Sequence, residues 1–341
     1  MILRAWPLLL LLPATFIALS GCVTRPLSVD DRAKLAGKTF IVTGASSGIG
    51  RGVALELGRG GANVVVVARR ERALQSVAQE VRALGGQALV VAADVTDTGQ
   101  MLQLAQQTVS RFGRIDGWIN SAGVVAVGRF EDVPLQDHQR ILDVNLKGVM
   151  TNSYLAIRQF RAQGAGVLIN VASVDGVVPH SYHASYSASK AGVISLGRVL
   201  NEELNLARLD DIHVVTVLPW AVDTPLWDHA GNYTGRVAQL PTMDGPEKVV
   251  NAIVRATLDP EDEIKVGYKA KMAYWSYRLA PDLTARFSAH AIEAAEVEIN
   301  PEAPRTPGNL YQPVEKGQGV SGGIRERMKD ETAPARRSSI P

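Results

Sequence analysis

Cysteine is nearly absent from this sequence of 341 residues, in which Cys22 is the only one. A single thiol cannot close an internal disulfide, and a zinc site built on two cysteines is excluded as well. An excess of one charge is also missing, because 36 lysines and arginines face 34 aspartates and glutamates. That balance does not supply the concentrated basic face of a nucleic-acid-binding protein, so no nucleic-acid partner is expected. The remaining composition, 46% hydrophobic and 21% charged, excludes wholesale disorder and a multispanning membrane protein.

The N-terminus carries a long apolar run. Residues 1–22 combine one charge, Arg4, with a leucine-rich stretch over residues 8–19 and two small residues after it. This order is typical of a secretory signal peptide, which takes no part in the fold. Residues 19–22, Leu-Ser-Gly-Cys, also resemble the lipobox of bacterial lipoproteins, in which the cysteine is acylated and becomes the mature N-terminus. The resemblance implies lipidation at Cys22 and a lipid-anchored, membrane-associated protein.

Two other interpretations of this segment stay open. Ala5–Thr24 is an uncharged run of 20 residues, about the length that crosses the ~30 Å hydrocarbon core, which fits an uncleaved signal anchor. The positive-inside rule would then keep the domain in the cytoplasm, because the four cations within residues 25–38 outnumber Arg4. The rule does not decide the matter, since long domains are translocated regardless of charge. The third interpretation is a misassigned start, although the next methionine, Met101, lies inside the domain.

From Lys38 onward, short β-branched runs alternate with helical stretches. The runs are apolar on both faces, as in parallel strands that helices cover on each side. Helical patterns of suitable length, such as residues 49–59, 72–84 and 99–111, lie between them. The alternation predicts an α/β fold with a doubly wound parallel sheet and right-handed crossovers. The predicted strands are Thr39–Thr43, Asn63–Ala68, Ala88–Ala92, Gly117–Asn120, Gly166–Val171, His213–Leu218 and Glu263–Val266.

The pattern changes after the last predicted strand. Residues 268–300 have helical character, and residues 301–341 contain 6 prolines and 5 glycines, which favours an extended or disordered tail. The part from Lys265 to Leu279 mixes basic and aromatic residues. It is either a membrane-surface segment or an extra helix packed on the domain, with its lysines reaching outward. The predicted organisation is a signal or anchor over 1–22, a linker over 23–36, one domain over 37–267, the helical extension and the tail.

The first strand runs into a glycine-rich turn that opens a helix. Glycines let the backbone approach a pyrophosphate closely, and the free N–H groups and dipole of the helix favour its negative charge. The alternative is an ordinary tight strand–helix turn. Because a strand precedes the turn and a helix follows it, we expect a dinucleotide site. Its candidate residues are Thr43, Gly44, Ser46, Ser47, Gly48, Ile49 and Gly50.

The end of the second strand indicates which dinucleotide binds. A site for NAD places an acidic residue here to bind the ribose 2′-hydroxyl, whereas this chain has Arg69 and Arg70. The forked donors of arginine suit a 2′-phosphate. NADP(H) is therefore favoured over NAD(H). The alternative is that the two arginines merely begin a solvated helix.

Ser173 and the pair Tyr186 and Lys190 are the candidates for chemistry. Tyrosine and lysine four residues apart share one helix face. An ammonium beside a phenol favours the phenolate and lowers the pKa of the tyrosine. Carbonyl reduction or alcohol oxidation requires such a general acid/base near neutral pH. The Tyr-x-x-x-Lys spacing alone is common by chance, so its meaning depends on the other motifs.

Taken together, the motifs are highly specific. Thr-Gly-x-x-x-Gly-x-Gly at 43–50 is followed in order by Asp94-Val95, Asn120-x-Ala122-Gly123, Asn145, Ser173, Tyr186 and Lys190. In this the chain resembles the short-chain dehydrogenase/reductase family, in its branch of about 250 residues. The resemblance covers roughly residues 38–266. It implies a Rossmann-type fold, a nicotinamide cofactor and hydride transfer.

The resemblance also implies roles for individual residues. Tyr186 would be the general acid/base, and Ser173 would hydrogen-bond the reacting oxygen. Lys190 would hold the nicotinamide ribose and tune Tyr186, while Asn145 would position a water of the proton relay. Long helices at 135–160 and 186–206 pair subunits in relatives, which implies a homodimer or homotetramer. The further cofactor residues that the resemblance implies are Asp94, Val95, Asn120, Ala122, Gly123, Pro219 and Thr224.

Two positions depart from the family pattern. Ser121 stands where the family usually has a second asparagine, which removes one amide. Trp220 stands where the family usually has a glycine after Pro219. A tryptophan at this place is expected to narrow the pocket or to bend the loop.

Three segments that are mostly apolar or aromatic are expected to line the substrate side, at residues 124–127, 174–182 and 220–235. They contain no Arg or Lys, so a carboxylate or phosphate substrate is disfavoured and a small hydrophobic carbonyl compound or alcohol is favoured. The alternative is a lid that packs on itself. His180 and His183 lie here without partners in the sequence, so we interpret them as polar loop residues and predict no metal site. The candidate pocket residues are Val125, Val174, Tyr182, Trp220, Leu226 and Trp227.

Two functions are compatible with the sequence. The first is an NADP(H)-dependent oxidoreductase that acts on a CH–OH or C=O group. The alternative is a non-catalytic NADP(H)-binding sensor or scaffold at a membrane. The complete set of catalytic candidates favours the enzyme, because a pure binder has no use for a tuned phenol.

Overall fold

The computed structural model describes residues 24–240 and 242–332. The predicted signal or anchor, with its candidate lipidation site Cys22, lies outside these residues. Within them, no helix has the length and apolar character that a bilayer span requires. The predicted linker contains one short helix, α1 (Val29–Ala33).

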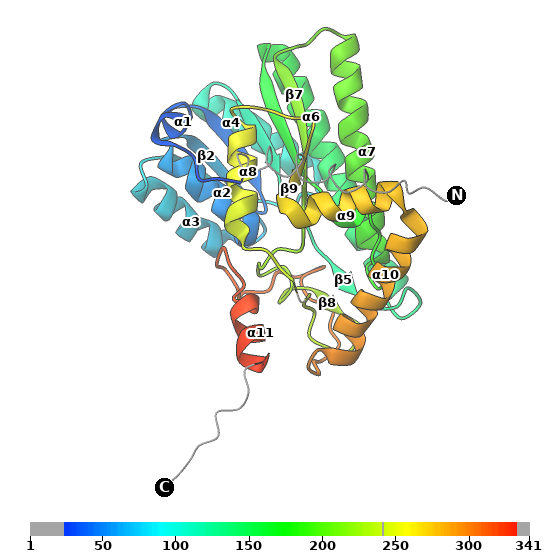
Figure 1. Cartoon of the computed structure of the whole chain (residues 1–341). Coiled ribbons are helices and arrows are strands. Elements are labelled where there is room, and N and C mark those ends of the chain that lie inside the picture. The colour runs from blue at the N-terminus through cyan, green and yellow to red at the C-terminus, as the bar shows by residue number, and fades with distance from the viewer. Residues whose placement is uncertain (1–23, 241, 333–341) are drawn as a thin grey trace, which may run out of the picture.

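Seven parallel strands form one sheet in the order β3-β2-β1-β4-β6-β7-β9 (Figure 1). The chain starts near the middle, winds outward through β2 and β3, and returns to β4 on the other side of β1. The predicted doubly wound sheet is therefore confirmed. The strands are β1 (Thr39–Thr43), β2 (Asn63–Ala68), β3 (Gln87–Ala92), β4 (Gly117–Asn120), β6 (Gly166–Val171), β7 (Ile212–Pro219) and β9 (Glu263–Val266).

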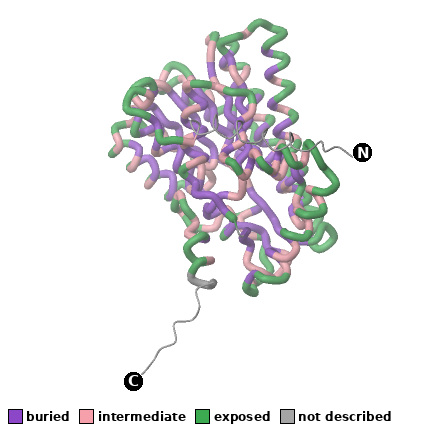
Figure 2. The backbone as a smooth tube through the Cα atoms, viewed as in Figure 1, coloured by how far each residue is buried: buried purple, intermediate pink, exposed green. Residues whose placement is uncertain are grey.

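Helices cover both faces of the sheet, because successive residues of a strand enter opposite cores. In β2, Val64 and Val66 pack with α2, α3 and α8, whereas Val65 and Val67 pack with α4, α5, α6 and α7. Figure 2 shows the strands as the buried centre of the domain. The helices are α2 (Gly48–Arg59), α3 (Glu71–Ala83), α4 (Thr98–Phe112), α5 (Leu135–Leu142), α6 (Gly148–Gln163), α7 (Ala184–Leu206) and α8 (Pro246–Ala256).

The helix expected over residues 135–160 is present but interrupted. Between α5 and α6 the chain forms a π-helical turn, η2 (Asp143–Lys147). Such turns occur frequently at functional sites. This one carries Asn145, whose side chain is fully buried.

The residues after β9 form a helical extension. It consists of α9 (Gly267–Leu279), α10 (Pro281–Glu293) and a π-helical turn, η4 (Ala294–Ile299). α9 buries Ala270 and Tyr274 against a cluster that includes Val193 and Leu218. A two-stranded parallel sheet that no sequence pattern predicts, β5 (Ala126–Val127) and β8 (Gly231–Asn232), lies outside the main sheet.

The C-terminal tail crosses the domain surface. Isolated bridges join Glu302 to Arg236 and Thr306 to Asn232. From residue 307 to 323 the tail contains no helix or strand, yet Leu310 is fully buried in the core on the α4–α7 side. A helix that the sequence analysis did not anticipate, α11 (Ile324–Thr332), follows. The described part of the tail is thus packed onto the domain.

Candidate active site

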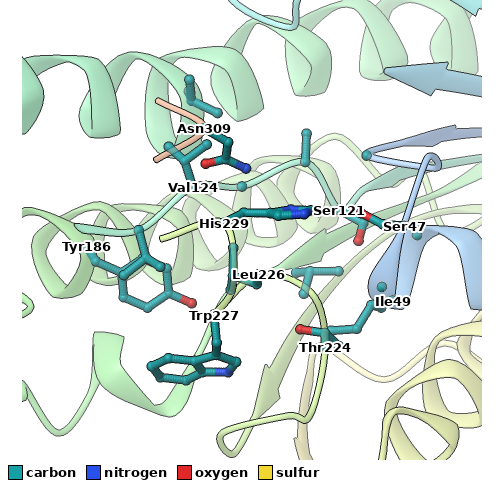
Figure 3. A pocket seen from close by; sticks show the side chains of 18 of the residues that line it. Ser47, Ile49, Ser121, Val124, Tyr186, Thr224, Leu226, Trp227, His229 and Asn309 are labelled. Carbon is teal, nitrogen blue, oxygen red and sulfur yellow. The ribbon is translucent and has the colours of Figure 1, made fainter. Parts of the chain in front are cut away.

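The carboxyl ends of β1, β4, β6 and β7 surround a pocket beside the point where the strand order reverses (Figure 3). Ligands of open parallel sheets bind at this point. Figure 3 shows Tyr186 at one side of the pocket and Ser47 and Ile49 at the other. The predicted residues that line it are Gly44, Ser46, Ser47, Gly48, Ile49, Gly50, Arg69, Arg70, Asp94, Val95, Ala122, Gly123, Val125, Ser173, Tyr186, Lys190, Pro219, Trp220, Thr224, Leu226 and Trp227.

Five predicted residues do not line the pocket. The Thr43 Oγ1 accepts hydrogen bonds from the Ser121 and Ala122 N–H groups, which ties the glycine-rich turn to the end of β4. The Asn120 amide donates to the Asn170 Oδ1 at 2.9 Å, between β4 and β6. Thr43 and Asn120 therefore support the pocket from behind. The five are Thr43, Asn120, Asn145, Val174 and Tyr182.

The glycine-rich turn brings the start of α2 close to the end of β4. Gly44 has a φ of +70°, and a Cβ there would lie 2.8 Å from the Ala122 backbone. A Cβ on Gly50 would lie 2.5 Å from the Gly44 carbonyl oxygen. The close approach therefore requires glycine at both positions. Among the described residues, the N–H groups of Ile49 and Gly50 have no hydrogen-bond partner.

Backbone carbonyls of the tail accept hydrogen bonds from the two arginines at the end of β2. Arg69 donates to the Asn309 carbonyl at 2.7 Å and to the Tyr311 carbonyl at 2.9 Å. Arg70 donates to the Val314 carbonyl at 2.7 Å. Burial lowers the pKa of both guanidinium groups, which nevertheless stay charged. Neutral oxygens of the chain thus take positions that an anionic group could occupy.

Asp94, at the end of β3, is held in a network with Arg140. The Arg140 Nη2 lies 2.7 Å from the Asp94 Oδ2, and the Thr96 N–H and hydroxyl both donate to the other oxygen. Burial alone would raise the pKa of Asp94, but these hydrogen bonds outweigh it and hold the pKa below its usual value. Asp94 therefore presents an ionised carboxylate to the pocket.

Asn145 fixes the backbone where β4 leads into the pocket. Its amide donates to the Val124 carbonyl at 2.8 Å and its oxygen accepts from the Val124 N–H at 2.9 Å. A third contact reaches the Ser189 hydroxyl at 3.2 Å. The side chain thus connects the π turn, the β4 end and α7.

Ser173, Tyr186 and Lys190 lie at one side of the pocket. Desolvation of the phenol and the charge of Asp175 raise the pKa of Tyr186, while its hydrogen bond with Ser173 acts in the opposite direction. This direction is opposite to the lowered pKa that the spacing of Tyr186 and Lys190 predicts. Burial of the phenol is the main cause. Lys190 does not offset it, because its ammonium donates to the Val171 carbonyl at 2.8 Å and lies 5.5 Å from the centre of the Tyr186 ring.

The pKa of Lys190 lies close to neutral pH. Its side chain is buried, and burial lowers the pKa of Lys190 to about 8, with Asp175 opposing the shift. An ammonium taken out of water loses its proton more readily. Lys190 therefore exchanges a proton within the physiological range.

An ion-pair network lies beside Tyr186. The His183 Nδ1 is 3.0 Å from the Asp175 Oδ2, and its Nε2 is 3.1 Å from the Glu296 Oε1 of the helical extension. Burial would lower the pKa of His183, but Glu296 and Asp175 outweigh it and raise the pKa to about 10. Burial would raise the pKa of Asp175, but His180 and His183 outweigh it and hold the pKa far below its usual range. His183 is consequently an imidazolium between two carboxylates.

His180 completes this network. Its Nδ1 lies 2.8 Å from the Asp175 Oδ1. One ligand-type atom each of Asp175, His180 and His183 lies within 4.8 Å of the others, the one such group of three among residues 24–240 and 242–332. Because both nitrogens of His183 already face carboxylates, we interpret the group as an ion-pair network rather than a metal centre.

Two tryptophans are among the residues that line the pocket. Trp220, at the usual glycine position, donates its indole N–H to the Thr242 carbonyl at 2.9 Å. Trp227 donates to the Val222 carbonyl at 3.0 Å. Tyr182 instead points to the helical extension, where its hydroxyl donates to Glu293 at 3.2 Å. Trp220 thus lines the pocket while it packs on the cluster that includes Val178 and Leu218, and Tyr182 connects its loop to α10.

The structure adds pocket residues that the sequence analysis missed. Asp175 lies two positions from Ser173 and could have been found as an acidic residue next to the catalytic candidates. His183 was interpreted only as a polar loop residue, although it stands three positions before Tyr186. The others carry no signal that the sequence motifs reveal. The missed residues include Arg140, Asp175, His183, His229, Leu240, Asn309, Pro313 and Val314.

Comparisons with known proteins agree with this geometry. Residues 38–233 match the family described as short chain dehydrogenase. The uncharacterized oxidoreductase YxnA of Bacillus subtilis (strain 168) is 31% identical over 281 residues, 82% of this chain and 79% of that protein. The ketoacyl reductase HetN of Nostoc sp. is 32% identical over 235 residues, 68% of this chain and 79% of that protein. A short-chain type dehydrogenase/reductase from Mycobacterium marinum is similar in structure, with a TM-score of 0.59, 33% identity and coverage of 70% of this chain and 96% of that one.

Proposed function

Since the chain belongs to the short-chain dehydrogenase/reductase family, we propose that it is an NADP(H)-dependent oxidoreductase. It transfers a hydride between the nicotinamide and a hydrophobic ketone, aldehyde or secondary alcohol. One observation carries the proposal: the glycine-rich turn and the side chains of Ser173, Tyr186 and Lys190 line a single pocket. A cofactor seated on the turn therefore shares a cavity with the proposed general acid/base.

The residues fit a nicotinamide dinucleotide. The unpaired N–H groups of Ile49 and Gly50, at the start of α2, are donors suited to a pyrophosphate. Asp94 and Val95 would contact the adenine, and Thr224 the nicotinamide carboxamide. The bound cofactor supplies or accepts the hydride, while the protein orients it and manages the proton.

The preference for NADP(H) rests on Arg69 and Arg70. No acidic residue follows β2 at this place, so the ribose 2′-hydroxyl of NAD would lack its usual acceptor. A phosphate dianion is a stronger acceptor for a guanidinium than the neutral carbonyls of the tail. NADP(H) would therefore replace the tail as the partner of one or both arginines.

The proposed chemistry assigns the proton to Tyr186. In carbonyl reduction its hydroxyl donates a proton to the substrate oxygen, and Ser173 holds that oxygen by a hydrogen bond. Lys190, with its pKa of about 8, binds the ribose and stabilises the phenolate that forms. Asn145 keeps the loop at Val124 in place, and its proposed water belongs to the proton relay. Alcohol oxidation uses the same groups in reverse.

The proposed substrate class follows from the walls of the pocket. The arginines Arg69, Arg70 and Arg140 line the end where the adenosine would lie. Around Tyr186, beside Lys190 and His183, the lining is formed by apolar side chains that include Val125, Leu226 and Trp227. A hydrophobic carbonyl compound suits this surface. Two relatives, the ketoacyl reductase HetN and an Arabidopsis thaliana 11-beta-hydroxysteroid dehydrogenase-like protein, carry names that indicate such chemistry.

Two further proposals concern assembly and location. The exposed apolar residues Met150 and Tyr154 of α6 support a homodimer or homotetramer through the long helices. The N-terminal sequence supports membrane attachment by a lipid on Cys22, with an uncleaved signal anchor and a cytoplasmic domain as the alternative. Labelling with a fatty-acid probe, compared with Cys22→Ala, tests the lipid, and protease accessibility in spheroplasts tests the side of the membrane.

The proposed activity is tested by incubating the full chain with NADPH and a panel of hydrophobic ketones. We expect turnover that Tyr186→Phe abolishes while NADPH binding persists. Tyr182→Phe is a matched control, because that hydroxyl contacts Glu293 instead of the pocket. Tight NADPH binding with no turnover of any ketone or alcohol would favour the second candidate, a cofactor-binding sensor or scaffold.

A further inference from the structure

The outer side of the helical extension is an apolar stripe. Along α9, Tyr268, Met272, Trp275 and Leu279 recur at helical spacing, so they share one face. Figure 2 shows exposed residues along these helices, which Figure 1 places at the edge of the domain. The exposed fractions are 62% for Tyr268, 64% for Met272, 54% for Trp275, 83% for Leu279, 71% for Leu283 and 75% for Phe287. We call these six residues the α9–α10 face.

Packing of the domain does not require this face. α9 already buries Ala270 and Tyr274 on its opposite side, so it has two apolar sides where a surface helix normally has one. Large exposed apolar patches on soluble proteins usually mark an interaction site. Here four large apolar side chains share one face of α9, and the adjoining α10 exposes two more. The α9–α10 face is therefore a candidate interaction site.

The charges around the face have one predominant sign. Lys271, Arg278 and Arg286 form no ion pair among the described residues, whereas Lys269 on the inner side is paired with Asp244. From residue 268 to 290 the only acidic residue is Asp282. The partner surface is thus expected to combine apolar material with negative charge.

We propose that the α9–α10 face docks on the surface of a bilayer that contains anionic lipid. Aromatic and basic side chains together suit the boundary between headgroups and acyl chains. A second copy of the chain fits less well, because a two-fold contact pairs the same surface of both subunits and would bring two predominantly basic patches together. The apolar run that precedes Thr24 is consistent with a membrane location, and the Asn251 amide of α8 holds the Thr24 carbonyl at 3.3 Å.

Docking of this face would place the domain in a fixed orientation on the bilayer. The same extension contacts the pocket loop through Glu293 and Glu296. The membrane-facing helices and the loop that carries His183 are therefore parts of one packed unit. This inference concerns the surface of the domain and does not depend on the proposed oxidoreductase activity.

The test uses the full chain, with Trp275 as the reporter. Wild type and Trp275→Phe are mixed with vesicles of phosphatidylcholine alone or with phosphatidylglycerol, each containing brominated lipid that quenches tryptophan on contact. The difference between the two proteins isolates Trp275. Because the N-terminal segment can hold the chain on any vesicle, contact of Trp275 rather than binding is measured.

We expect quenching of Trp275 on the anionic vesicles and much less on the neutral ones. Leu283→Glu with Phe287→Glu should reduce the quenching to the level of Trp275→Phe. Leu206→Glu is the control, since Leu206 is 84% exposed at the far end of α7. Circular dichroism checks that each variant is folded.

Three results would overturn the proposal. The first is a vesicle-bound protein with unquenched Trp275. The second is equal quenching on neutral and anionic vesicles that the glutamate variants do not change. The third is a blue shift of Trp275 that grows with protein concentration without lipid, which would assign the face to a second copy. None of these readouts involves NADPH or turnover, so the proposed activity can fail or succeed separately.

Discussion

The His183 Nε2 lies 3.1 Å from the Glu296 Oε1, although the two residues are 113 positions apart. Both side chains are almost completely buried, with exposed fractions of 1% and 0%. Glu296 belongs to the extension after the Rossmann-type domain, and His183 precedes Tyr186 by one helical turn. The contact therefore couples the extension to the loop beside the proposed general acid/base.

Replacement of Glu296 should destabilise the protein. Glu296→Gln leaves the buried imidazolium with only one carboxylate, and removal of one partner from a buried pair costs about 3–5 kcal/mol. We expect a reduction of this size in the free energy of unfolding, measured with urea at pH 7. Glu298→Gln, at an exposed position of the same turn, should change it little. A loss of equal size in both variants would contradict the role of the buried pair.

The His183 network also predicts a dependence of stability on pH. The pKa of His183 is raised to about 10 in the folded protein, against about 6.5 in an unfolded chain. The stabilisation is therefore complete below pH ~6.5 and is lost as the pH rises through about 10. We expect the free energy of unfolding to fall across this window in the wild type. His183→Gln should remove this component, and an identical slope in the variant would show that other groups cause it.

Much of this architecture could be predicted from local sequence. Runs such as Asn63–Ala68 are valine-rich because both faces of the strand are buried. The hydrophobic pattern therefore predicts all seven strands of the main sheet. The motifs around the glycine-rich turn and Tyr186 mark the pocket, because its glycines and catalytic candidates must lie at fixed strand ends. Local rules of this kind act over a few residues.

The parts that could not be predicted depend on distant segments. Arg69 donates to the backbone carbonyl of Asn309, which lies 240 positions away in the tail. Every residue has such a carbonyl, so the identity of residue 309 does not indicate the contact. Glu296 likewise lies in a segment whose helical pattern gives no hint of His183. The expected lowering of the Tyr186 pKa was wrong, because the spacing of Tyr186 and Lys190 does not reveal where the ammonium points.

Lys190 predicts a pH profile for the proposed reaction. Its pKa of about 8 means that the ammonium is present below pH 8 and disappears above it. The rate of ketone reduction under saturating NADPH should therefore decline as the pH rises through about 8. Lys190→Arg keeps a positive charge at all these pH values, so its lower rate should lack this inflection. A variant profile that still bends near pH 8 would assign the titration to another group.

Arg69 predicts how the protein distinguishes the two nicotinamide cofactors. A hydrogen bond to a charged group contributes about 1.5–3 kcal/mol, and 1.4 kcal/mol corresponds to a tenfold change in affinity. Arg69→Gln should therefore raise the Kd for NADPH roughly tenfold or more and leave the Kd for NADH nearly unchanged, as measured by calorimetry. Arg72→Gln, exposed in the first turn of α3, is the matched control. An equal rise of the Kd for NADPH and for NADH in Arg69→Gln would mean that Arg69 anchors the tail and does not bind the 2′-phosphate.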